Sequence, residues 1–304
     1  MTLTQIEYIL AVAKEQSFRG AAKSRFVTQP TLSMQIQKLE DELGVIIFDR
    51  SQSPILPTKI GALIIQQAKI VYDESMRIPE IIQTQKQGLI GDLSVGVIPT
   101  ISPYLVPLFL KSFNHRYPKI EISISELTTA HCLKQLEEEE IDAAILATKE
   151  DTKRFVQKRL YDEEFLLFAH KDNVLLKKKG ISISDINLKD IWLLEEGHCL
   201  SNEIIKTCHL RRDVSQLPGH LNFKIGTLES IRLLVQENFG YTLLPYLSTR
   251  KLSQQEKKLL RPFKEAQPKR TIYLTMRKGF LKEGLVEALN ATILEALPRE
   301  VRGQ

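Results

Sequence analysis

The segment 17–44, SFRGAAKSRFVTQPTLSMQIQKLEDELG, constrains the fold more than any other part of the chain. Ser17 is a typical N-cap for a short helix, in which a pair of alanines allows a neighbouring helix to pack closely. Thr28 offers a second N-cap, and Pro30 suits the first turn of a new helix because the missing N–H has no intrahelical partner there. The segment therefore predicts a short helix, a tight turn and a longer helix.

The longer helix has one apolar side and one side suited to DNA. The apolar side shares one face of a 3.6-residue wheel, so we expect all its members to be buried. The opposite side combines short polar groups, an amide and a cation, which suit base edges and phosphates in a major groove. A solvated helix face is the alternative interpretation. The apolar side is Leu32, Ile36, Leu39 and Leu43, and the polar side is Pro30, Thr31, Ser33, Met34, Gln37 and Lys38.

A small β-wing is expected directly after this helix. Gly44 is suited to end the helix, and residues 45–58, VIIFDRSQSPILPT, have the pattern of a strand, a turn and a second strand. Arg50 lies in this wing, where its guanidinium can reach a DNA phosphate. The spacing of Leu3, Ile6, Leu10 and Ala13 indicates an earlier helix, whose apolar stripe is expected to face a core.

Residues 1–61 resemble the winged helix-turn-helix of LysR-type transcriptional regulators. The small-residue helix, QPTLS, QIQKLE, LG and FDR follow one another in the order of that family. The resemblance implies binding to double-stranded operator DNA by a homodimer that assembles to a homotetramer, with RNA polymerase as a further partner. The DNA contacts that it implies are Gln29, Pro30, Thr31, Ser33, Met34, Lys38 and Arg50.

The next stretch predicts the linker helix through which regulators of this family dimerise. Residues 58–88 have an apolar stripe and no strong turn signal before Gly88. Pro79 lies inside this pattern, where it is expected to kink or end the helix. We therefore expect a DNA-binding domain over residues 1–60 and a linker or dimerisation helix over residues 61–90.

From residue 91 onward predicted strands alternate with predicted helices, which is typical of an α/β fold with mainly parallel sheets. The family resemblance implies a regulatory domain over 91–304, built from two Rossmann-like subdomains of the periplasmic-binding-protein type with a ligand or sensing site between them. Subdomain I is expected at about 91–163 and 268–304, and subdomain II at about 164–267. Strands are expected at 92–100, 119–126, 141–147, 190–196, 221–227, 241–245 and 270–277, and helices near 103–115, 129–140, 201–211, 228–238 and 282–296.

Composition narrows the class of protein. A chain of 304 residues with 43% hydrophobic residues can bury a full core, and a net charge of +5 permits an anionic partner without requiring one. The N-terminal sequence lacks the pattern of a secretory signal, and no apolar run approaches the roughly 20 residues of a membrane span. We therefore expect a cytoplasmic protein with no membrane partner. Thiols are kept reduced there, so the three cysteines do not predict a structural disulfide framework.

The cysteines differ in their surroundings. Cys132 lies in HCLKQLEEEE, which predicts an amphipathic helix with a solvated acidic side and a buried structural thiol. Cys199 follows EEGH at a predicted strand-to-helix junction, with Ser201 as a candidate N-cap. A helix N-terminus and a neighbouring imidazole both favour the thiolate, so Cys199 is a candidate for oxidation to sulfenic acid.

Cys208 cannot reach Cys199 without a change of structure. If residues 199–208 are helical, nine residues at 1.5 Å each separate the two by about 13 Å, whereas a disulfide needs Cα atoms within roughly 7 Å. Bond formation would unravel the segment and hold the domain in a second conformation.

Other interpretations of these residues remain open. The pairs His131–Cys132, His198–Cys199 and Cys208–His209 could supply nitrogen and sulfur ligands, but no CxxC or HxxxH pair anchors a metal site. A cysteine hydrolase needs a positioned base and an orienting Asn or Asp, which no motif displays. We expect no metal and no cofactor, and buried structural thiols remain the plain alternative to a redox function.

The segment LLEEGHCL with a second cysteine nine positions after Cys199 resembles the peroxide-sensing branch of the LysR family, as do VGVIPTISPYLVP and RTIYLTMRKG. The resemblance implies that hydrogen peroxide oxidises Cys199, the peroxidatic thiol, that Cys208 resolves the sulfenic acid, and that reductants of the glutaredoxin or thioredoxin type restore the thiols. It further implies a peroxide site of His198, Thr100 and Thr129, with Arg270 assisting the reaction.

Plainer roles exist for three of these residues. Thr100 and Thr129 could be helix caps, with Thr128 as a substitute for Thr129, and Arg270 could be a surface residue. The function expected is therefore a peroxide-sensing transcription factor and not an enzyme. A LysR-type regulator of another small effector is the nearest alternative, and a thiol peroxidase is the enzymatic one.

Overall fold

The computed structural model folds into two compact units, one of residues 1–88 with 279–281 and the other of residues 89–278 with 282–304. The side chains of residues 77 and 80–87 are outside the description. The residues that the structure describes are 1–87, 89–187, 190–194, 226–237, 240–264, 268–280 and 282–301.

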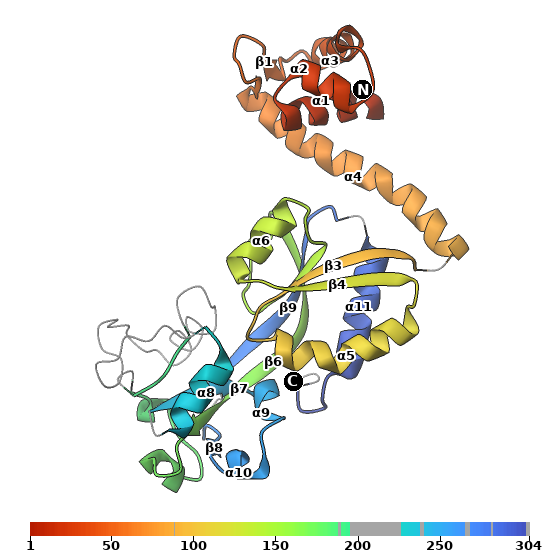
Figure 1. Cartoon of the computed structure of the whole chain (residues 1–304). Coiled ribbons are helices and arrows are strands. Elements are labelled where there is room, and N and C mark those ends of the chain that lie inside the picture. The colour runs from red at the N-terminus through yellow and green to blue at the C-terminus, as the bar shows by residue number, and fades with distance from the viewer. Residues whose placement is uncertain are drawn as a thin grey trace. The chain divides into compact units, whose positions relative to one another are not determined.

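The first unit is the predicted winged helix-turn-helix followed by one long helix (Figure 1). Its helix starts are those expected from the sequence, since Ser17 accepts a hydrogen bond from the Gly20 N–H and Thr28 accepts one from the Thr31 N–H. Gly44 ends the longer helix, Gln29–Leu43, in the left-handed conformation, with a φ of 67°. The elements are α1 (Leu3–Glu15), α2 (Phe18–Ser24), α3 (Gln29–Leu43), β1 (Phe48–Asp49), β2 (Leu56–Pro57) and α4 (Lys59–Gln87).

The inner side of α3 differs from the predicted one at its last turn. Leu32, Ile36 and Leu39 are fully buried, as predicted, but Leu43 is 41% exposed. Glu40 is buried instead, because its carboxylate accepts hydrogen bonds from backbone N–H groups of the wing. The expectation for Leu43 was therefore wrong, and so was that for Leu3 in α1, which is about half exposed.

The long helix α4 begins against the wing and runs through its proline. Gly61 permits the start, because a Cβ at that position would lie 2.0 Å from the carbonyl oxygen of Ile47. Pro79 lies inside α4, which continues to Gln87, so the proline does not end the helix.

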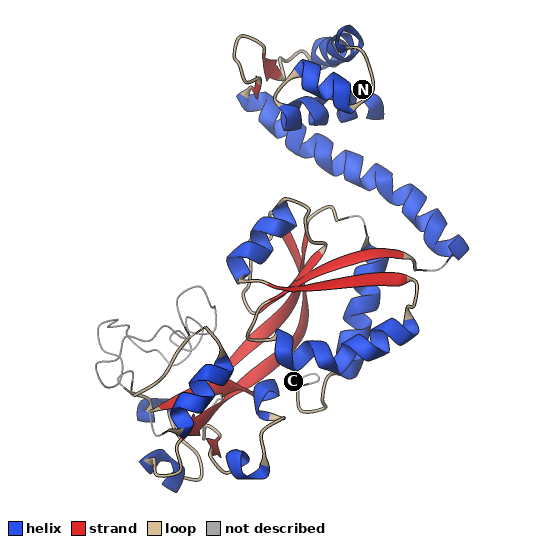
Figure 2. Cartoon of the chain, viewed as in Figure 1, coloured by secondary structure: helices blue, strands red, loops and turns tan. Residues whose placement is uncertain are grey.

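The second unit is built on a mixed sheet of seven strands in the order β4-β3-β5-β9-β6-β7, with β8 paired to β6. Figure 2 draws these strands in red. Among the described strands, β3 pairs in parallel with β4 and β5, whereas β9, β6, β7 and β8 form antiparallel pairs. Among the described strands antiparallel pairs therefore outnumber parallel ones, contrary to the expectation of mainly parallel sheets. The strands are β3 (Gly91–Val97), β4 (Ile120–Glu126), β5 (Ala143–Leu146), β6 (Phe155–Ala169), β7 (Tyr241–Pro245), β8 (Leu260–Arg261) and β9 (Lys269–Arg277).

The strand β6 was not predicted, and it joins the two halves of this unit. Residues 155–164 pair with β9, and residues 165–169 pair with β7. We call the part built on β3, β4 and β5 the first half and the part built on β7 and β8 the second half. The sheet is therefore continuous from one half to the other.

Helices cover the sheet on both halves (Figures 1 and 2). The core of the second half surrounds Trp192, which is almost fully buried, and Ile191 forms a bridge to Tyr241. The strand expected at 190–196 is thus a single bridge among the residues described there, and the helix expected at 201–211 lies outside the described residues. The helices are α5 (Ser102–Arg116), α6 (Thr129–Glu137), α8 (Leu228–Gln236), α9 (Tyr246–Thr249), α10 (Gln254–Lys257) and α11 (Glu283–Ala296), with short 3-10 turns at Val174–Lys177 and Ile183–Asp185.

Candidate functional site

The two predicted threonines lie at one edge of the sheet. Thr100 follows the end of β3, and Thr129 is the first residue of α6, directly after β4. Because β3 and β4 are parallel neighbours with Val97 opposite Glu126, both threonines follow the carboxyl ends of adjacent strands. Ligand sites of α/β sheets are formed at such edges.

Arg270 reaches the same edge from an antiparallel strand. In β9, Tyr273 pairs with Leu146 at the end of β5, so Arg270 lies three residues beyond that end. Its Nη1 donates to Thr100 Oγ1 at 3.1 Å, and its Nη2 donates to the Thr100 carbonyl oxygen at 3.2 Å. The structure therefore brings Arg270 and Thr100 into direct contact.

Glu163 is the residue that the sequence analysis missed at this site. Its Oε2 accepts hydrogen bonds from Arg270 Nη2 at 2.7 Å and Nε at 2.9 Å, and both side chains are 1% exposed. Its Oε1 accepts from the Leu247 N–H at 2.8 Å. Arg270 is thus a buried, paired cation, and its interpretation as a surface residue was wrong. No motif in the sequence marks Glu163, which stands beside two other acidic residues in DEE (162–164).

The threonines around α6 divide into a cap and a buried hydroxyl. Thr128 is the N-cap: its Oγ1 accepts from the His131 N–H and lies 2.8 Å from His131 Nδ1. The Oγ1 of Thr129 is buried and has no hydrogen-bond partner among the described residues. Thr100 does not cap α5 either, since the N-cap there is Ile101 without a side-chain bond. Capping therefore explains Thr128 but neither Thr100 nor Thr129.

Two tyrosines and one aspartate complete the electrostatics of this region. Burial and the Glu163 carboxylate raise the pKa of Tyr161 well above its usual value. Burial and the Glu229 carboxylate also raise the pKa of Tyr104, whose hydroxyl donates to Glu229 at 3.1 Å across the two halves. Both phenols are neutral at physiological pH, so Arg270 and Glu163 provide the buried charges.

Asp162 is adjacent to this cluster and has an opposite shift. Burial alone acts to raise the pKa of Asp162, but hydrogen bonds from Arg159, Lys269 and Thr271 outweigh it and lower the pKa to about 2. The Lys269 ammonium lies 2.8 Å from the carboxylate, and Thr271 donates to it at 2.8 Å. Asp162 is therefore an ionised, partnered group at neutral pH.

The cysteines of the predicted switch cannot be placed. Cys199, Cys208 and His198 lie outside the described residues. Cys132 is fully buried in α6, as predicted, and its Sγ fills the space above Gly96, where a Cβ would lie 2.9 Å from the sulfur. Within the described ranges, no three His, Cys, Asp or Glu side chains gather as metal ligands would.

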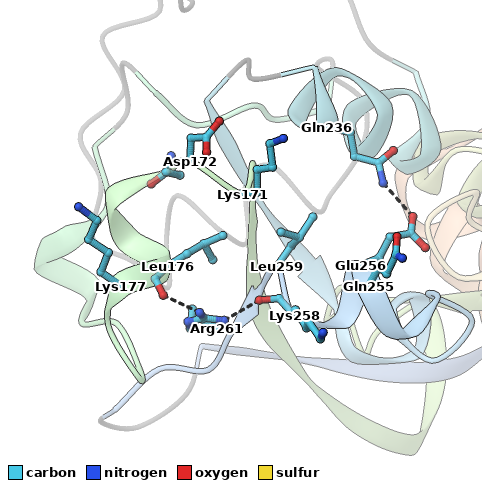
Figure 3. A pocket seen from close by; sticks show the side chains of 11 residues that line it. Lys171, Asp172, Leu176, Lys177, Gln236, Gln255, Glu256, Lys258, Leu259 and Arg261 are labelled. Atoms are coloured by element: carbon cyan, nitrogen blue, oxygen red, sulfur yellow. Dashed lines mark hydrogen bonds between the residues drawn. The ribbon is translucent and has the colours of Figure 1, made fainter.

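A surface pocket of about 810 Å³ lies in the second half and is lined by none of the residues above (Figure 3). Its guanidinium, Arg261, donates to the carbonyl oxygens of Leu176 and Lys258, and so is held by the fold. Its lysines are exposed. A smaller pocket of about 260 Å³ lies between α5 and α9, beside Tyr104 and Leu247. That volume is below the roughly 300–1,000 Å³ usual for small-molecule sites.

The predicted DNA-binding residues of α3 lie on its outer side. Gln29, Pro30, Thr31, Met34 and Lys38 are exposed, and Ser33 is half-buried. The outer side therefore presents the polar and cationic groups that a major-groove contact requires.

Arg50 is fixed by the fold of the wing. Its Nη2 donates to Glu40 Oε2 at 2.7 Å, and its guanidinium carbon lies 5.2 Å from the centre of the Phe18 ring. Glu40 Oε1 also accepts from the N–H groups of Ile47 and Phe48, at 2.7 and 3.2 Å. Glu40, which the sequence analysis missed, thus attaches the wing to α3 and orients Arg50.

Among the described helices, none is long and apolar enough to span a membrane.

Comparison with known proteins agrees with this architecture. Residues 3–62 match the bacterial regulatory helix-turn-helix protein, lysR family, and residues 86–298 match the LysR substrate binding domain. The hydrogen peroxide-inducible genes activator of Pectobacterium carotovorum subsp. carotovorum is 35% identical over 295 residues, which cover 97% of this chain and 96% of that protein.

Two solved structures are similar along nearly the whole chain. A full-length OxyR variant from Pseudomonas aeruginosa, in which a cysteine is replaced by aspartate, has a TM-score of 0.64 and 33% identity and covers 96% of this chain and 97% of its own. A cysteine-to-serine variant of Corynebacterium glutamicum OxyR with H2O2 bound has a TM-score of 0.64 and 26% identity, with coverages of 97% and 92%. The chain therefore belongs to the LysR family of DNA-binding transcriptional regulators and is similar to its OxyR members.

Proposed function

We propose that this regulator activates peroxide-inducible genes and senses hydrogen peroxide through Cys199 and Cys208. The Cys199 thiolate attacks one peroxide oxygen: an S–O bond forms, the O–O bond breaks, and the second oxygen leaves as hydroxide and takes up a proton. The Cys208 thiol then attacks the sulfenic sulfur, which forms the disulfide and releases a second water. Two electrons from a thiol reductant of the glutaredoxin or thioredoxin type restore the thiols.

The buried guanidinium of Arg270 on Thr100 is the observation that carries this proposal. A fixed cation at the carboxyl edge of β3 and β5 favours a developing hydroxide, and its charge is little screened by water because Arg270 is 2% exposed. Thr100 Oγ1 accepts from Arg270, so its own O–H remains suited to donate to a peroxide oxygen. The buried Thr129 hydroxyl provides a second such group. His198 is proposed as the third member from the sequence alone.

A further support is the name that similar proteins carry. The Pectobacterium relative is a hydrogen peroxide-inducible genes activator, and the Corynebacterium structure contains bound H2O2. Both are similar to this chain over more than nine-tenths of its length. A protein of this kind changes its contacts with operator DNA after oxidation and is restored by reduction, so it is not an enzyme.

We also propose a homodimer through α4, which assembles to a homotetramer that contacts RNA polymerase. Six large apolar side chains are 37–62% exposed among those described in α4. Met76 lies on the opposite side of the helix from the other five. These five fall within about 100° of arc on a wheel of 3.6 residues per turn, so they form a single stripe that a second copy can cover. These residues are Ile60, Leu63, Ile70, Val71 and Ile78.

Mass spectrometry of the folded full-length chain after stoichiometric hydrogen peroxide tests the sensing chemistry. We expect a Cys199–Cys208 disulfide in the wild type and a sulfenic acid at Cys199 in Cys208→Ser. Operator footprinting before and after oxidation then tests the regulatory output. If both thiols stay unmodified in the folded protein, the peroxide function is excluded, and a LysR-type regulator of another effector remains.

A matched pair of substitutions tests the proposed peroxide site. Thr129→Val removes a hydroxyl that makes no hydrogen bond to the described residues, so stability should be unchanged while the rate of Cys199 oxidation falls about ten-fold or more. Thr128→Ala removes the α6 cap, so stability should fall by about 1 kcal/mol while that rate is retained. Equal oxidation rates in the two variants would exclude Thr129 from the site.

A further inference from the structure

Phe26, in the turn between α2 and α3, is exposed to an unusual degree. Its side chain is 96% exposed, more than any other large hydrophobic residue described. Its φ of 55° lies in the left-handed region. Two unfavourable features therefore coincide at one residue of the helix-turn-helix.

Neither feature is explained by the stability of the fold. The position directly after the α2 cap is one where Gly or Asn is usual, because a Cβ is strained at positive φ. A bulky residue there is a conformational outlier. The exposed ring also gains almost nothing from burial, so replacing Phe26 should not cost the unit any packing. Strained residues of this kind are retained at functional sites.

The segment around Phe26 is positively charged, which suits binding to duplex DNA. The stretch from Gln16 to Leu39 contains four cations, Arg19, Lys23, Arg25 and Lys38, and no aspartate or glutamate. Arg19, Lys23 and Arg25 are exposed beside the ring in sequence. Phosphates attract such a cationic segment.

The ring also lies close to the end of α3 that enters the groove. Phe26 precedes Gln29, the first residue of α3, by three residues, a reach of at most about 11 Å. In helix-turn-helix proteins the N-terminal residues of the recognition helix contact base edges. An apolar ring at this place can cover a thymine methyl at the groove edge or the carbon face of a deoxyribose.

We propose that Phe26 is a DNA-contacting residue, which packs its ring on an apolar surface of operator DNA next to the N-terminal end of α3. The inference rests only on the family's DNA binding and not on the peroxide chemistry. The strain at Phe26 is retained because the turn places the ring where the duplex covers it.

Phe26→Gly separates this role from a structural one. Glycine accepts a φ of 55° without strain, so the melting temperature of the variant should equal or exceed that of the wild type. Binding to a duplex selected by the full-length wild-type chain from a randomised pool should weaken about ten-fold. The matched control is Gln16→Gly, which relieves the same strain at a φ of 50° in the same unit and should leave affinity within about two-fold.

Salt dependence and base methyls identify the surface that is contacted. Phe26→Gly should leave the slope of log affinity against log salt unchanged, whereas Lys23→Ala should reduce it by about one. Replacing single thymines by uracil removes one methyl at a time. If one replacement weakens binding of the wild type but not of Phe26→Gly, the ring contacts that thymine methyl. If no replacement weakens binding of the wild type, the ring packs on the sugar. Unchanged affinity in Phe26→Gly, or a lower melting temperature, would overturn the proposal.

Discussion

Replacing Glu163 by glutamine tests the buried ion pair most directly. Glutamine keeps an oxygen that can accept from Leu247 and Arg270, but it leaves the guanidinium without a compensating charge where both side chains are 1% exposed. Removal of one partner of a buried pair destabilises by about 3–5 kcal/mol, and the retained hydrogen bonds place this change near 3 kcal/mol. The loss appears in the free energy of unfolding of the second unit.

Trp192 makes this measurement specific. It is the single tryptophan of the chain and is buried in the second unit, so urea unfolding followed by its fluorescence reports that unit. With a slope of about 2–3 kcal/mol per molar urea, the unfolding midpoint should fall by about 1–1.5 M.

Two further variants make the result interpretable. Glu164→Gln, at the next residue of β6, should change stability by less than about 0.5 kcal/mol. The double variant Glu163→Gln/Arg270→Gln should be more stable than the sum of the single changes predicts, by about 1.5 kcal/mol or more. A Glu163→Gln midpoint equal to that of Glu164→Gln would refute the argument that the pair is buried and coupled.

Three other outcomes follow from the structure. Because the pKa of Asp162 is lowered to about 2, its ionised carboxylate stabilises the fold above pH 4, and this contribution is lost as pH falls towards 2. Asp162→Asn should therefore cost about 1 kcal/mol at pH 7 and almost nothing near pH 2, measured by urea unfolding. Glu40→Gln should cost about 2 kcal/mol and speed amide exchange across the wing, read by hydrogen–deuterium exchange of residues 45–58. Gly61→Ala should lower the melting temperature of the first unit by several degrees, because the added Cβ overlaps the Ile47 carbonyl oxygen.

Local signals were sufficient to predict the first unit from its sequence. Thr28, Pro30 and Gly44 act on the backbone within a few residues, and each has the role that its chemistry predicts. The error at Leu43 arose because a helical wheel treats a carboxylate as polar. Glu40 turns inward only because the wing, which follows later in the chain, presents two N–H groups to it.

The second unit was harder to predict because its decisive contacts are not local. The strand β6 contains charged residues, a pattern that is typical of a solvent-exposed segment. In the structure, Asp162 and Glu163 form ion pairs with Lys269 and Arg270 of β9, more than a hundred positions later. Thr100 and Arg270 were predicted as site residues from a family resemblance, and the structure shows them in direct contact. Their role at a peroxide site stays a prediction. Glu163 has no motif of its own, so only the structure could assign it.

The contacts of Arg270 also limit how the protein can change over time. Its guanidinium holds the end of β3 and the strand β6 together, and Glu163 extends the connection to Leu247 in the second half. Loss of either charge alone leaves the other buried and uncompensated, whereas an uncharged pair of similar volume need not destabilise the fold. Positions 163 and 270 should therefore behave as one epistatic unit: single replacements are purged, and a lineage can leave this pair only by a concerted exchange of both residues.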